Sequence, residues 1–231
     1  MTYLSDIIRF VENAAGHRLN RDEGIQHGRN DRLIRGATLA WMASPDAIGA
    51  AGAAGHDLLI GHESLYFPYD VIVADNPPPG WREWQINRQR FDLLEKYQLS
   101  FLRLHGSVDK ISIFDTFAEL LGLGAPVYAD GLVKVYEIPP CPLAELVERV
   151  KQSVGMPHLR VAALASGASA GRTVHRVGLP WGGLGLFVNV GYQQQLIEQG
   201  CDVFIAGESD NYGFRFAAEC GIPMIETSHE V

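Results

Sequence analysis

Hydrophobic residues recur at helical spacing near the N-terminus. Leu4, Ile7 and Val11 would lie on one face of a helix, so residues Thr2 to Ala15 are predicted to form an amphipathic helix packed on the core. A polar stretch from Arg18 to Arg35 follows. The pattern predicts a structural helix at the start of the chain and assigns no regular element to the polar stretch.

Short apolar runs alternate with helical patterns along the rest of the chain. Strands are predicted at Gly36 to Met42, Asp57 to Ile60, Leu99 to Leu104, Leu159 to Leu164, Val203 to Ala206 and Ile222 to Ile225. Helices are predicted at Asp46 to Ala54 (begun by Ser44-Pro45), Arg88 to Tyr97, Ile111 to Leu121, Pro142 to Ser153 and Tyr192 to Gln199. Strands that alternate with helices favour an α/β fold with a largely parallel sheet.

One segment departs from this alternation. Asp130-Gly131 separates two apolar runs within Val127 to Ile138, which predicts an antiparallel hairpin. Pro139-Pro140 follows directly and marks a junction. We therefore expect either one large domain or two packed lobes, of about residues 1–140 and 141–231.

A short internal sequence similarity is consistent with two similar lobes. Residues Gly55 to Ser64 can be laid on Gly200 to Ser209, and glycine, aspartate, isoleucine, glutamate and serine coincide. Each segment follows a predicted helix. One match of ten residues fits a true repeat or a recurrence of the same helix, turn and strand pattern, and the sequence leaves both open.

Composition and charge narrow the functional classes. The formal net charge of -8 and the absence of clustered Lys and Arg argue against a nucleic acid partner. Cys141, Cys201 and Cys220 are too few and too far apart for a disulfide framework, which favours reduced thiols. The sequence shows neither an export signal nor a run of apolar residues long enough to span a bilayer. We expect a cytoplasmic protein without a membrane partner.

Polar residues follow four of the predicted strands. They are His62 and Glu63, then His105 and Asp109, then Glu208 and Asp210, and lastly His229 and Glu230. Strand ends are often polar because they leave the core, but agreement over four strands favours a common site. A mixed set of nitrogen and oxygen donors suits one or two divalent ions of zinc, iron or manganese, and also magnesium. If two ions bind, Asp109 or Glu63 could bridge them.

The chain resembles the NIF three-like family from about Asp22 to its end; bacterial members of this family are named GTP cyclohydrolase I type 2 homologs. The family's motifs are, in order, D-N-x-G-L, T-H-H-P, H-T-N-L-D, T-G-D or T-G-E, and G-H-x-x-[ST]-E. The corresponding segments here are Asp22 to Gln26, Gly61 to Phe67, His105 to Asp109, Ala206 to Glu208 and Ser228-His229. Each motif is weak alone, and their order and spacing carry the resemblance.

The resemblance implies a set of metal ligands. His62, Asp109 and His229 match ligand positions, and Glu63 stands where the family usually has its second histidine. A glutamate there would make the site harder and more anionic, which leaves the identity and number of the metal ions open. The family's last ligand is a glutamate four residues beyond His229, so we expect a C-terminal tail beyond Val231 to supply it.

The resemblance also implies an architecture and an assembly. It predicts a single domain over residues 1–231 with two similar βα lobes, mostly parallel strands and a metal site between the lobes at the carboxyl ends of the strands. It leaves no room for the ferredoxin-like insertion that some members carry. It implies a toroidal homo-oligomer, such as a hexamer, as the partner of each chain.

The function expected from these residues is a metal-dependent hydrolase that acts on a small, nucleotide-like substrate. The metal would activate water, Glu208 or His105 would carry protons, and loop aromatics would position the substrate. Those aromatics are Tyr66, Phe67, Trp81 and Trp84. The alternatives are a non-enzymatic role, as a metal-dependent oligomeric scaffold or metal chaperone, and a metal-free nucleotide-binding domain built around the glycine cluster Pro180 to Gly185.

Overall fold

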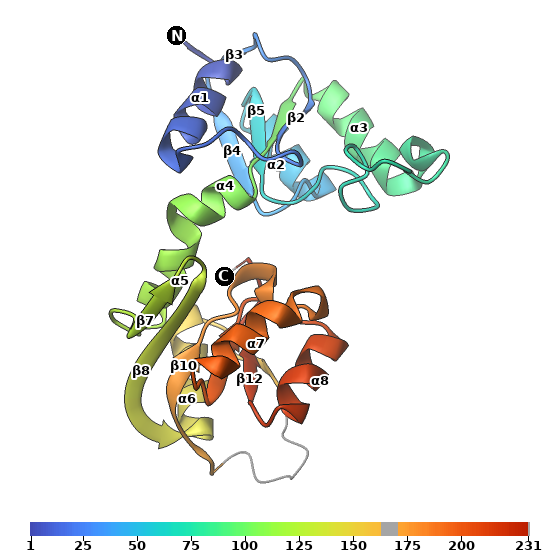
Figure 1. Cartoon of the computed structure of the whole chain (residues 1–231). Helices are drawn as coiled ribbons and strands as arrows, with labels where there is room; N and C mark the ends of the chain where they lie inside the picture. The colour runs from blue at the N-terminus through green and yellow to red at the C-terminus, as the bar shows by residue number, and fades with distance from the viewer. Residues whose placement is uncertain (163–170, 231) are drawn as a thin grey trace. The chain divides into compact units, whose positions relative to one another are not determined.

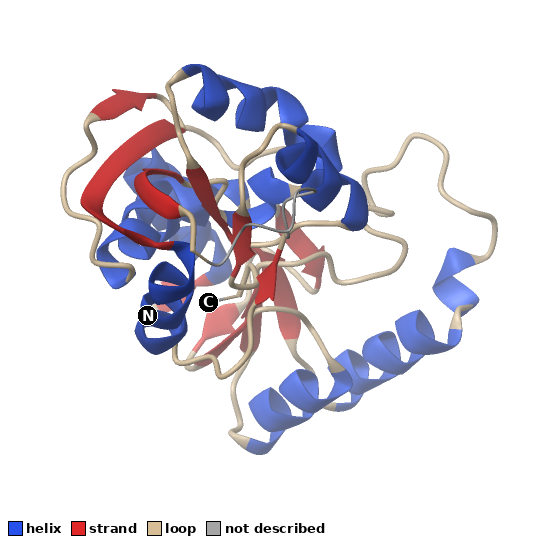
Figure 2. Ribbon diagram, turned by 90° about the horizontal axis from the view of Figure 1, so that it is seen from below, coloured by secondary structure: helices blue, strands red, loops and turns tan. Residues whose placement is uncertain are grey.

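The structure is a computed structural model that describes residues 1–162 and 171–230. The chain forms two compact units, Met1–Ile113 and Phe114–Val231, and their elements are traced in Figures 1 and 2. Both units combine helices with strands, so the predicted α/β class is confirmed. No helix in the described part of the chain is long and apolar enough to cross a bilayer.

The first unit is built on a four-stranded sheet with the strand order β2-β6-β5-β4. Its strands are β2 (Gly24–His27), β4 (Ala37–Ala40), β5 (Leu58–Gly61) and β6 (Ser100–Arg103). β4, β5 and β6 pair in parallel, whereas β2 pairs antiparallel with β6. A separate small sheet pairs β1 (Thr2–Tyr3) with β3 (Leu33–Ile34).

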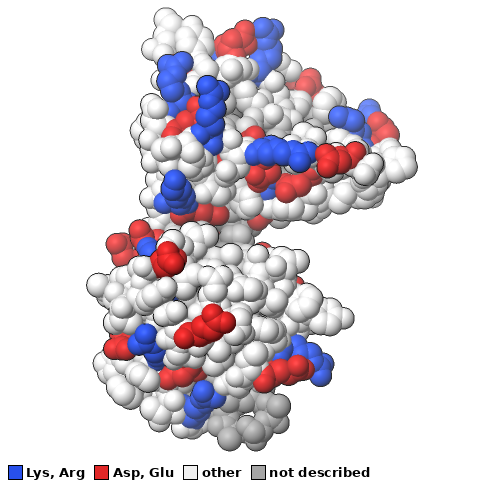
Figure 3. Space-filling model, in the orientation of Figure 1, with Lys and Arg blue, Asp and Glu red and all other residues white. Residues whose placement is uncertain are grey.

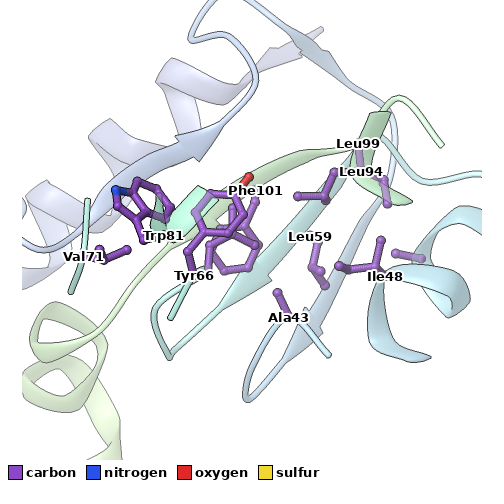
Figure 4. Packing of buried hydrophobic residues seen from close by; sticks show 11 residues of the cluster. Ala43, Ile48, Leu59, Tyr66, Val71, Trp81, Leu94, Leu99 and Phe101 are labelled. Atoms are coloured by element: carbon purple, nitrogen blue, oxygen red, sulfur yellow. The ribbon is translucent and has the colours of Figure 1, made fainter. Parts of the chain in front are cut away.

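Hydrophobic residues of β5 contribute to both faces of this sheet. The helices of the unit are α1 (Leu4–Ala15), α2 (Pro45–Ala53) and α3 (Gln85–Lys96), with a 3-10 turn η1 (Trp81–Glu83). Leu58 packs in one cluster with Leu4 of α1. Leu59 packs in another with Ile48 of α2 and Leu94 of α3, as Figure 4 shows. Because side chains alternate along a strand, one short strand builds two cores.

The predicted start of α2 is confirmed in detail. Ser44 is the N-cap, and its hydroxyl accepts a hydrogen bond from the backbone N–H of Ala47 at 3.1 Å. Pro45 follows as the first helical residue, where its missing N–H costs nothing. The polar stretch Arg18 to Arg35, by contrast, contains β2 and β3, which the sequence did not predict.

The second unit contains a six-stranded sheet with the order β7-β8-β10-β11-β12-β9. The strands are β7 (Tyr128–Asp130), β8 (Val133–Pro142), β9 (Arg160–Val161), β10 (Thr173–Gly178), β11 (Val203–Ala206) and β12 (Met224–Glu226). β10, β11 and β12 are parallel, and the other pairings are antiparallel. The sheets of both units are therefore mixed, each with a parallel trio of strands.

The helices of the second unit pack their apolar residues on this sheet. Besides the helix that begins the unit at Phe114, they include α6 (Leu143–Val154), α7 (Val190–Glu198) and α8 (Asn211–Glu219), with 3-10 turns η3 (Gly182–Gly185) and η4 (Phe187–Asn189). Leu196 of α7 and Ala217 of α8 join Phe204 and Met224 of the strands in one buried cluster. The sequence did not predict α8 or β10.

The predicted hairpin is confirmed. β7 and β8 pair antiparallel, and Asp130 faces Val133 across a two-residue connection. Gly131 has φ of 56°, a left-handed conformation that glycine adopts without strain. β8 continues through Pro139 and Pro140, the residues expected to form a junction. Of the strand expected at 159–164, residues 160 and 161 form β9, and residues 163 and 164 lie outside the described part of the chain.

A continuous helical run follows β6. It consists of α4 (Gly106–Val108), the π-helical turn η2 (Asp109–Ile113) and α5 (Phe114–Leu120). The helix predicted from Ile111 to Leu121 therefore begins earlier, directly after His105. Single π-helical turns inside helices occur frequently at functional sites, and this one begins at Asp109.

Candidate metal centre

The end of β5 presents His62 and Glu63. The backbone N–H groups of both residues donate to the carbonyl oxygen of Trp41 at 2.9 Å, so the segment that follows β4 fixes their backbone. The Trp41 indole also stacks on the His62 imidazole, with centroids 4.2 Å apart and planes inclined by 19°. His62 is buried, and Trp41 therefore defines the plane of a buried candidate ligand.

Asp109 is the second candidate ligand in the first unit. Its Oδ1 atom lies 3.8 Å from Nε2 of His62, and its side chain is only 13% exposed. Imidazole nitrogens and carboxylate oxygens bind divalent ions at about 2.0–2.2 Å, so two donors can share one ion when they are up to about 4.2 Å apart. The pair fits that limit, and both residues belong to a His/Asp group that could hold a metal ion.

His105 is held by an acidic residue from the start of the chain. The Glu23 carboxylate accepts hydrogen bonds from the backbone N–H of His105 at 2.6 Å and of Ser107 at 3.0 Å, and from the Ser107 hydroxyl at 2.6 Å. Burial acts to raise the pKa of Glu23, but these hydrogen bonds outweigh it and lower the pKa. Glu23 is therefore ionised, and the hydrogen bonds that its carboxylate accepts fix the turn after β6.

The His105 ring is oriented by a second carboxylate. Its Nδ1 lies 2.7 Å from Oδ2 of Asp22. Burial opposes ionisation of Asp22, but its hydrogen bond with His105 and the nearby charge of Arg103 prevail and lower its pKa. An ionised carboxylate only accepts hydrogen bonds, so Nδ1 donates and Nε2 is the nitrogen left for proton exchange. The ring meets His62 edge to face, with centroids 4.8 Å apart.

Arg103, the last residue of β6, lies beneath these groups and is fully buried. Its Nε donates to the carbonyl oxygen of His62 at 3.1 Å. Its Nη1 pairs with the carboxylates of both Asp22, at 3.1 Å, and Asp70. Another nitrogen donates to the Tyr69 hydroxyl at 2.5 Å. The guanidinium thus joins the end of β6 to the loop that follows β5 and to the segment before β2.

Sequence reasoning missed most of this supporting network. Asp22 and Glu23 lie in the first segment that resembles the family, but they were given no role. Arg103 carried a signal of its own, because a cation inside the apolar run Leu99 to Leu104 needs buried carboxylates to compensate it. Asp70 and Tyr69 had no comparable signal.

The second unit places His229 beside Glu208, the expected proton carrier. Nδ1 of His229 lies 3.5 Å from Oε1 of Glu208, and the His229 side chain is 8% exposed, whereas that of Glu208 is 40% exposed. The backbone N–H of Glu208 donates to the carbonyl oxygen of Gly182 at 2.9 Å. A histidine and a carboxylate that could each coordinate or carry a proton therefore meet at the ends of β12 and β11.

The glycine cluster after β10 forms a tight turn against this pair. A Cβ atom on Gly182, whose φ is 52°, would lie 2.8 Å from Nε2 of His229. A Cβ on Gly185 would lie 2.4 Å from the carbonyl oxygen of Glu208. Glycine is required at both positions because side chains and backbone approach too closely for any larger residue.

Two of the polar residues at strand ends have local structural contacts. Asp210 caps α8 and accepts hydrogen bonds from the backbone N–H groups of Tyr212 and Gly213 at 2.9 and 2.8 Å. Glu230 accepts a hydrogen bond from the hydroxyl of Ser228, two residues earlier. The donors that remain at strand ends are His62, Glu63, His105, Asp109, Glu208 and His229.

Comparisons with known proteins identify the family. The profile of the Duf34/NIF3 (NGG1p interacting factor 3) family matches residues 2–231. The fold is similar to that of the Bacillus cereus protein related to NIF3, with a TM-score of 0.77 and 15% identity over 99% of this chain and 88% of that one. It is similar to Staphylococcus aureus hypothetical protein SA1388, with a TM-score of 0.76 and 14% identity over 98% and 86%. Reduced HcgD from Methanocaldococcus jannaschii gives a TM-score of 0.71 and 20% identity over 99% and 88%.

No curated protein matches the sequence. The structural likenesses are at low identity and bear on the fold, whereas the family profile covers nearly the whole chain. The expected resemblance is confirmed: the chain belongs to the Duf34/NIF3 family.

Proposed function

We propose that this protein binds a divalent metal ion through His62, Asp109 and His229 and acts as a metal-dependent hydrolase on a small, nucleotide-like substrate. The observation that carries the proposal is the 3.8 Å separation of His62 Nε2 and Asp109 Oδ1, which suits two ligands of one ion. The family resemblance supports His229 as the third ligand. Glu63, the fourth ligand expected from the sequence, is considered in the next subsection.

The donor set fits a divalent ion of intermediate softness. Two imidazoles and one carboxylate suit zinc, iron or manganese better than magnesium, which prefers oxygen ligands. When bound, the ion would polarise the substrate and lower the pKa of a coordinated water to near neutrality. The fixed ring of His62 and the buried carboxylate of Asp109 would reduce the reorganisation needed for binding.

His105 is the proton carrier that the geometry of the first unit favours. Its Nδ1–H donates to Asp22, which leaves Nε2 to accept or return a proton. A histidine oriented by a carboxylate is a common arrangement for general acid-base catalysis. Glu208 is the alternative carrier, because its half-exposed carboxylate lies within 3.5 Å of His229.

The aromatic residues expected to position a substrate fall into two groups. Tyr66 and Trp81 are 8% and 6% exposed and belong to the core cluster in Figure 4, which favours a packing role. Phe67 and Trp84 are 39% and 41% exposed and remain available to contact a ring. Aromatic stacking in the proposed function therefore rests on these two residues.

Self-association into a toroidal oligomer is part of the proposal and rests on the family resemblance alone.

The surface in Figure 3 intermixes acidic and basic residues, and no continuous basic patch is visible on that face. This distribution supports a small-molecule substrate rather than a polyanion.

Elemental analysis of the purified protein tests the metal site. Wild type is expected to retain stoichiometric divalent metal, and Asp109→Asn, which keeps the side-chain shape but removes the charge, is expected to lose it. Asp31→Asn, a change at an exposed carboxylate, is the control and should retain the metal. A panel of phosphate esters, cyclic amides and nucleotides then tests hydrolysis.

The outcomes separate the candidate functions. Turnover that disappears in Asp109→Asn and after treatment with a chelator would support the hydrolase. Retained metal without turnover on any substrate would favour the scaffold or metal chaperone. Equal metal content in wild type and Asp109→Asn would contradict the proposed ligand set.

A further inference from the structure

Glu63 lies beside groups of the chain itself. Burial and the negative charge of its carboxylate raise the pKa of the Tyr69 hydroxyl. Its Oε2 atom is buried, has no hydrogen-bond partner among the described residues, and lies 3.9 Å from a terminal nitrogen of Arg103. The Tyr69 hydroxyl in turn accepts a hydrogen bond from Arg103. Arg103 therefore attracts Glu63 by charge and also donates a hydrogen bond to the neighbouring Tyr69 hydroxyl.

The same guanidinium lies beside the other donor that a second ion in this unit could use. A terminal nitrogen of Arg103 is 3.4 Å from Nδ1 of His105, and that Nδ1 is already paired with Asp22. Among the residues that the structure describes, neither Glu63 nor His105 belongs to a group of three donors that could hold a metal ion. The two donors therefore flank a cation that the chain itself supplies.

We propose that Arg103 takes the place of a second divalent ion, so that each chain binds one metal ion and Glu63 is not a ligand. The inference rests on the proposed function, because it assumes the ion held by His62 and Asp109. It replaces the expectation of one or two ions with a single ion. It also makes Glu63 an ion-pair partner of Arg103 instead of a metal ligand.

Electrostatics favours this exclusion. An ion bound by Glu63 would lie about 2 Å from the carboxylate and hence a few ångströms from the guanidinium, where two cations repel strongly in a buried setting. Arginine cannot relieve the repulsion by losing a proton. Nor can the side chain move aside at low cost, because it would leave the carboxylates of Asp22 and Asp70 without their cation.

Metal stoichiometry and affinity test the inference on the full chain. Wild type, Glu63→Gln and Asp109→Asn are loaded with excess Zn²⁺ or Mn²⁺, desalted and analysed by mass spectrometry of the elements, and titration calorimetry gives the Kd. We expect one ion in wild type, one in Glu63→Gln with a Kd within about threefold of wild type, and a loss of at least about tenfold in affinity in Asp109→Asn.

A double variant tests the role of charge directly. Arg103→Gln combined with Asp70→Asn removes the cation together with one of its carboxylate partners, so fewer carboxylates lose their compensating charge than in Arg103→Gln alone. We expect this variant to bind a second ion through Glu63 and His105. Circular dichroism establishes whether it is folded, and if it is not, the stoichiometry of wild type and the Glu63→Gln affinity decide the question.

Each result bears on a distinct claim. Two ions in wild type, or a loss of tenfold or more in the affinity of Glu63→Gln, would overturn the inference and leave the proposed metal site intact. A folded double variant that still binds one ion would also overturn it. No metal in wild type would overturn both the inference and the proposed function.

Discussion

The two units use the same strand arrangement to position different groups. Each has a parallel trio, β4-β5-β6 in the first and β10-β11-β12 in the second. Before the middle strand, Asp57 accepts a hydrogen bond from the backbone N–H of Arg35, and Asp202 accepts one from that of Arg176. In both cases an aspartate ties the start of its strand to the neighbouring parallel strand. The segments Gly55 to Ser64 and Gly200 to Ser209, which echo each other in sequence, therefore occupy corresponding places.

The correspondence continues to the strand ends. After β5, the backbone N–H groups of His62 and Glu63 donate to the carbonyl oxygen of Trp41. After β11, the N–H of Glu208 donates to the carbonyl oxygen of Gly182. In each unit the loop after the preceding strand fixes the backbone of the polar residues. The ends of β5 and β11 therefore share one backbone frame, that is, the same backbone arrangement.

The residues placed on that frame differ in charge. Arg103 faces Gly61 in the pairing of β5 with β6, and Glu226 faces Ala206 in the pairing of β11 with β12. Arg103 collects carboxylates around it, whereas Glu226 pairs with the half-exposed Arg160 at 3.1 Å. One register position thus carries opposite charges, and this difference determines which groups gather at each strand end.

The largest loss of stability is expected from removing the charge of Arg103 in the first unit. Arg103→Leu should lower the free energy of unfolding by about 3–5 kcal/mol, because the part-buried carboxylates of Asp22 and Asp70 lose a fully buried cation at short range. Glu226→Leu is the matched change and should cost about 1–2 kcal/mol, since Arg160 can turn to solvent. Urea unfolding followed by circular dichroism measures both. Equal losses would contradict this difference, because they would show that Arg103 and Glu226 contribute equally to the free energy of unfolding.

Acid should weaken the first unit through Asp57. The hydrogen bond from the Arg35 side chain, helped by the charges of Arg35 and Arg32, lowers the pKa of Asp57 from 3.8 to about 2 despite its burial. Its stabilising contribution is complete above about pH 4, where the unfolded aspartate is also ionised, and is lost as the pH falls towards 2. Unfolding free energies of wild type and Asp57→Asn should therefore converge over this range. A constant difference down to pH 2 would contradict the assignment.

The smallest expected effect concerns the ring that the first unit stacks on His62. Trp41→Leu keeps the carbonyl oxygen that holds His62 and Glu63 but removes the stacked indole. Metal affinity should fall about tenfold, as is typical when a group that orients a ligand is lost. Calorimetry with Trp41→Phe, which restores an aromatic face, should show partial recovery. Unchanged affinity in Trp41→Leu would mean that the backbone alone orients the imidazole.

The sequence predicted elements where apolar residues follow a clear period and missed them elsewhere. β10 escaped prediction because a register shift between Val174 and Arg176 breaks its alternation. α8 fully buries only the small residues Gly213 and Ala217, so no large buried residue marks it in the sequence. β2 lies at the edge of its sheet and is only half buried. A regular apolar period is the signal that predicts an element, and these elements either break the period or bury few large side chains.

The candidate ligands were more predictable than the network that supports them. His62 and Asp109 follow buried strands, and the ends of parallel strands meet at one edge of a sheet. The partners of Arg103, by contrast, lie 81 and 33 residues away at Asp22 and Asp70. Contacts that distant in sequence follow from the path of a loop, which local patterns do not specify.

The π-helical turn at Asp109 makes the placement of this carboxylate depend on chain length. A π turn contains one residue more than a regular α-helical turn, and each helical residue advances by about 100° around the axis. A deletion of one residue between positions 109 and 113 would restore a regular helix and rotate the helical residues that directly follow by about 100° relative to Asp109. Insertions and deletions, rather than substitutions, are therefore the changes to which the direction of this side chain is most sensitive.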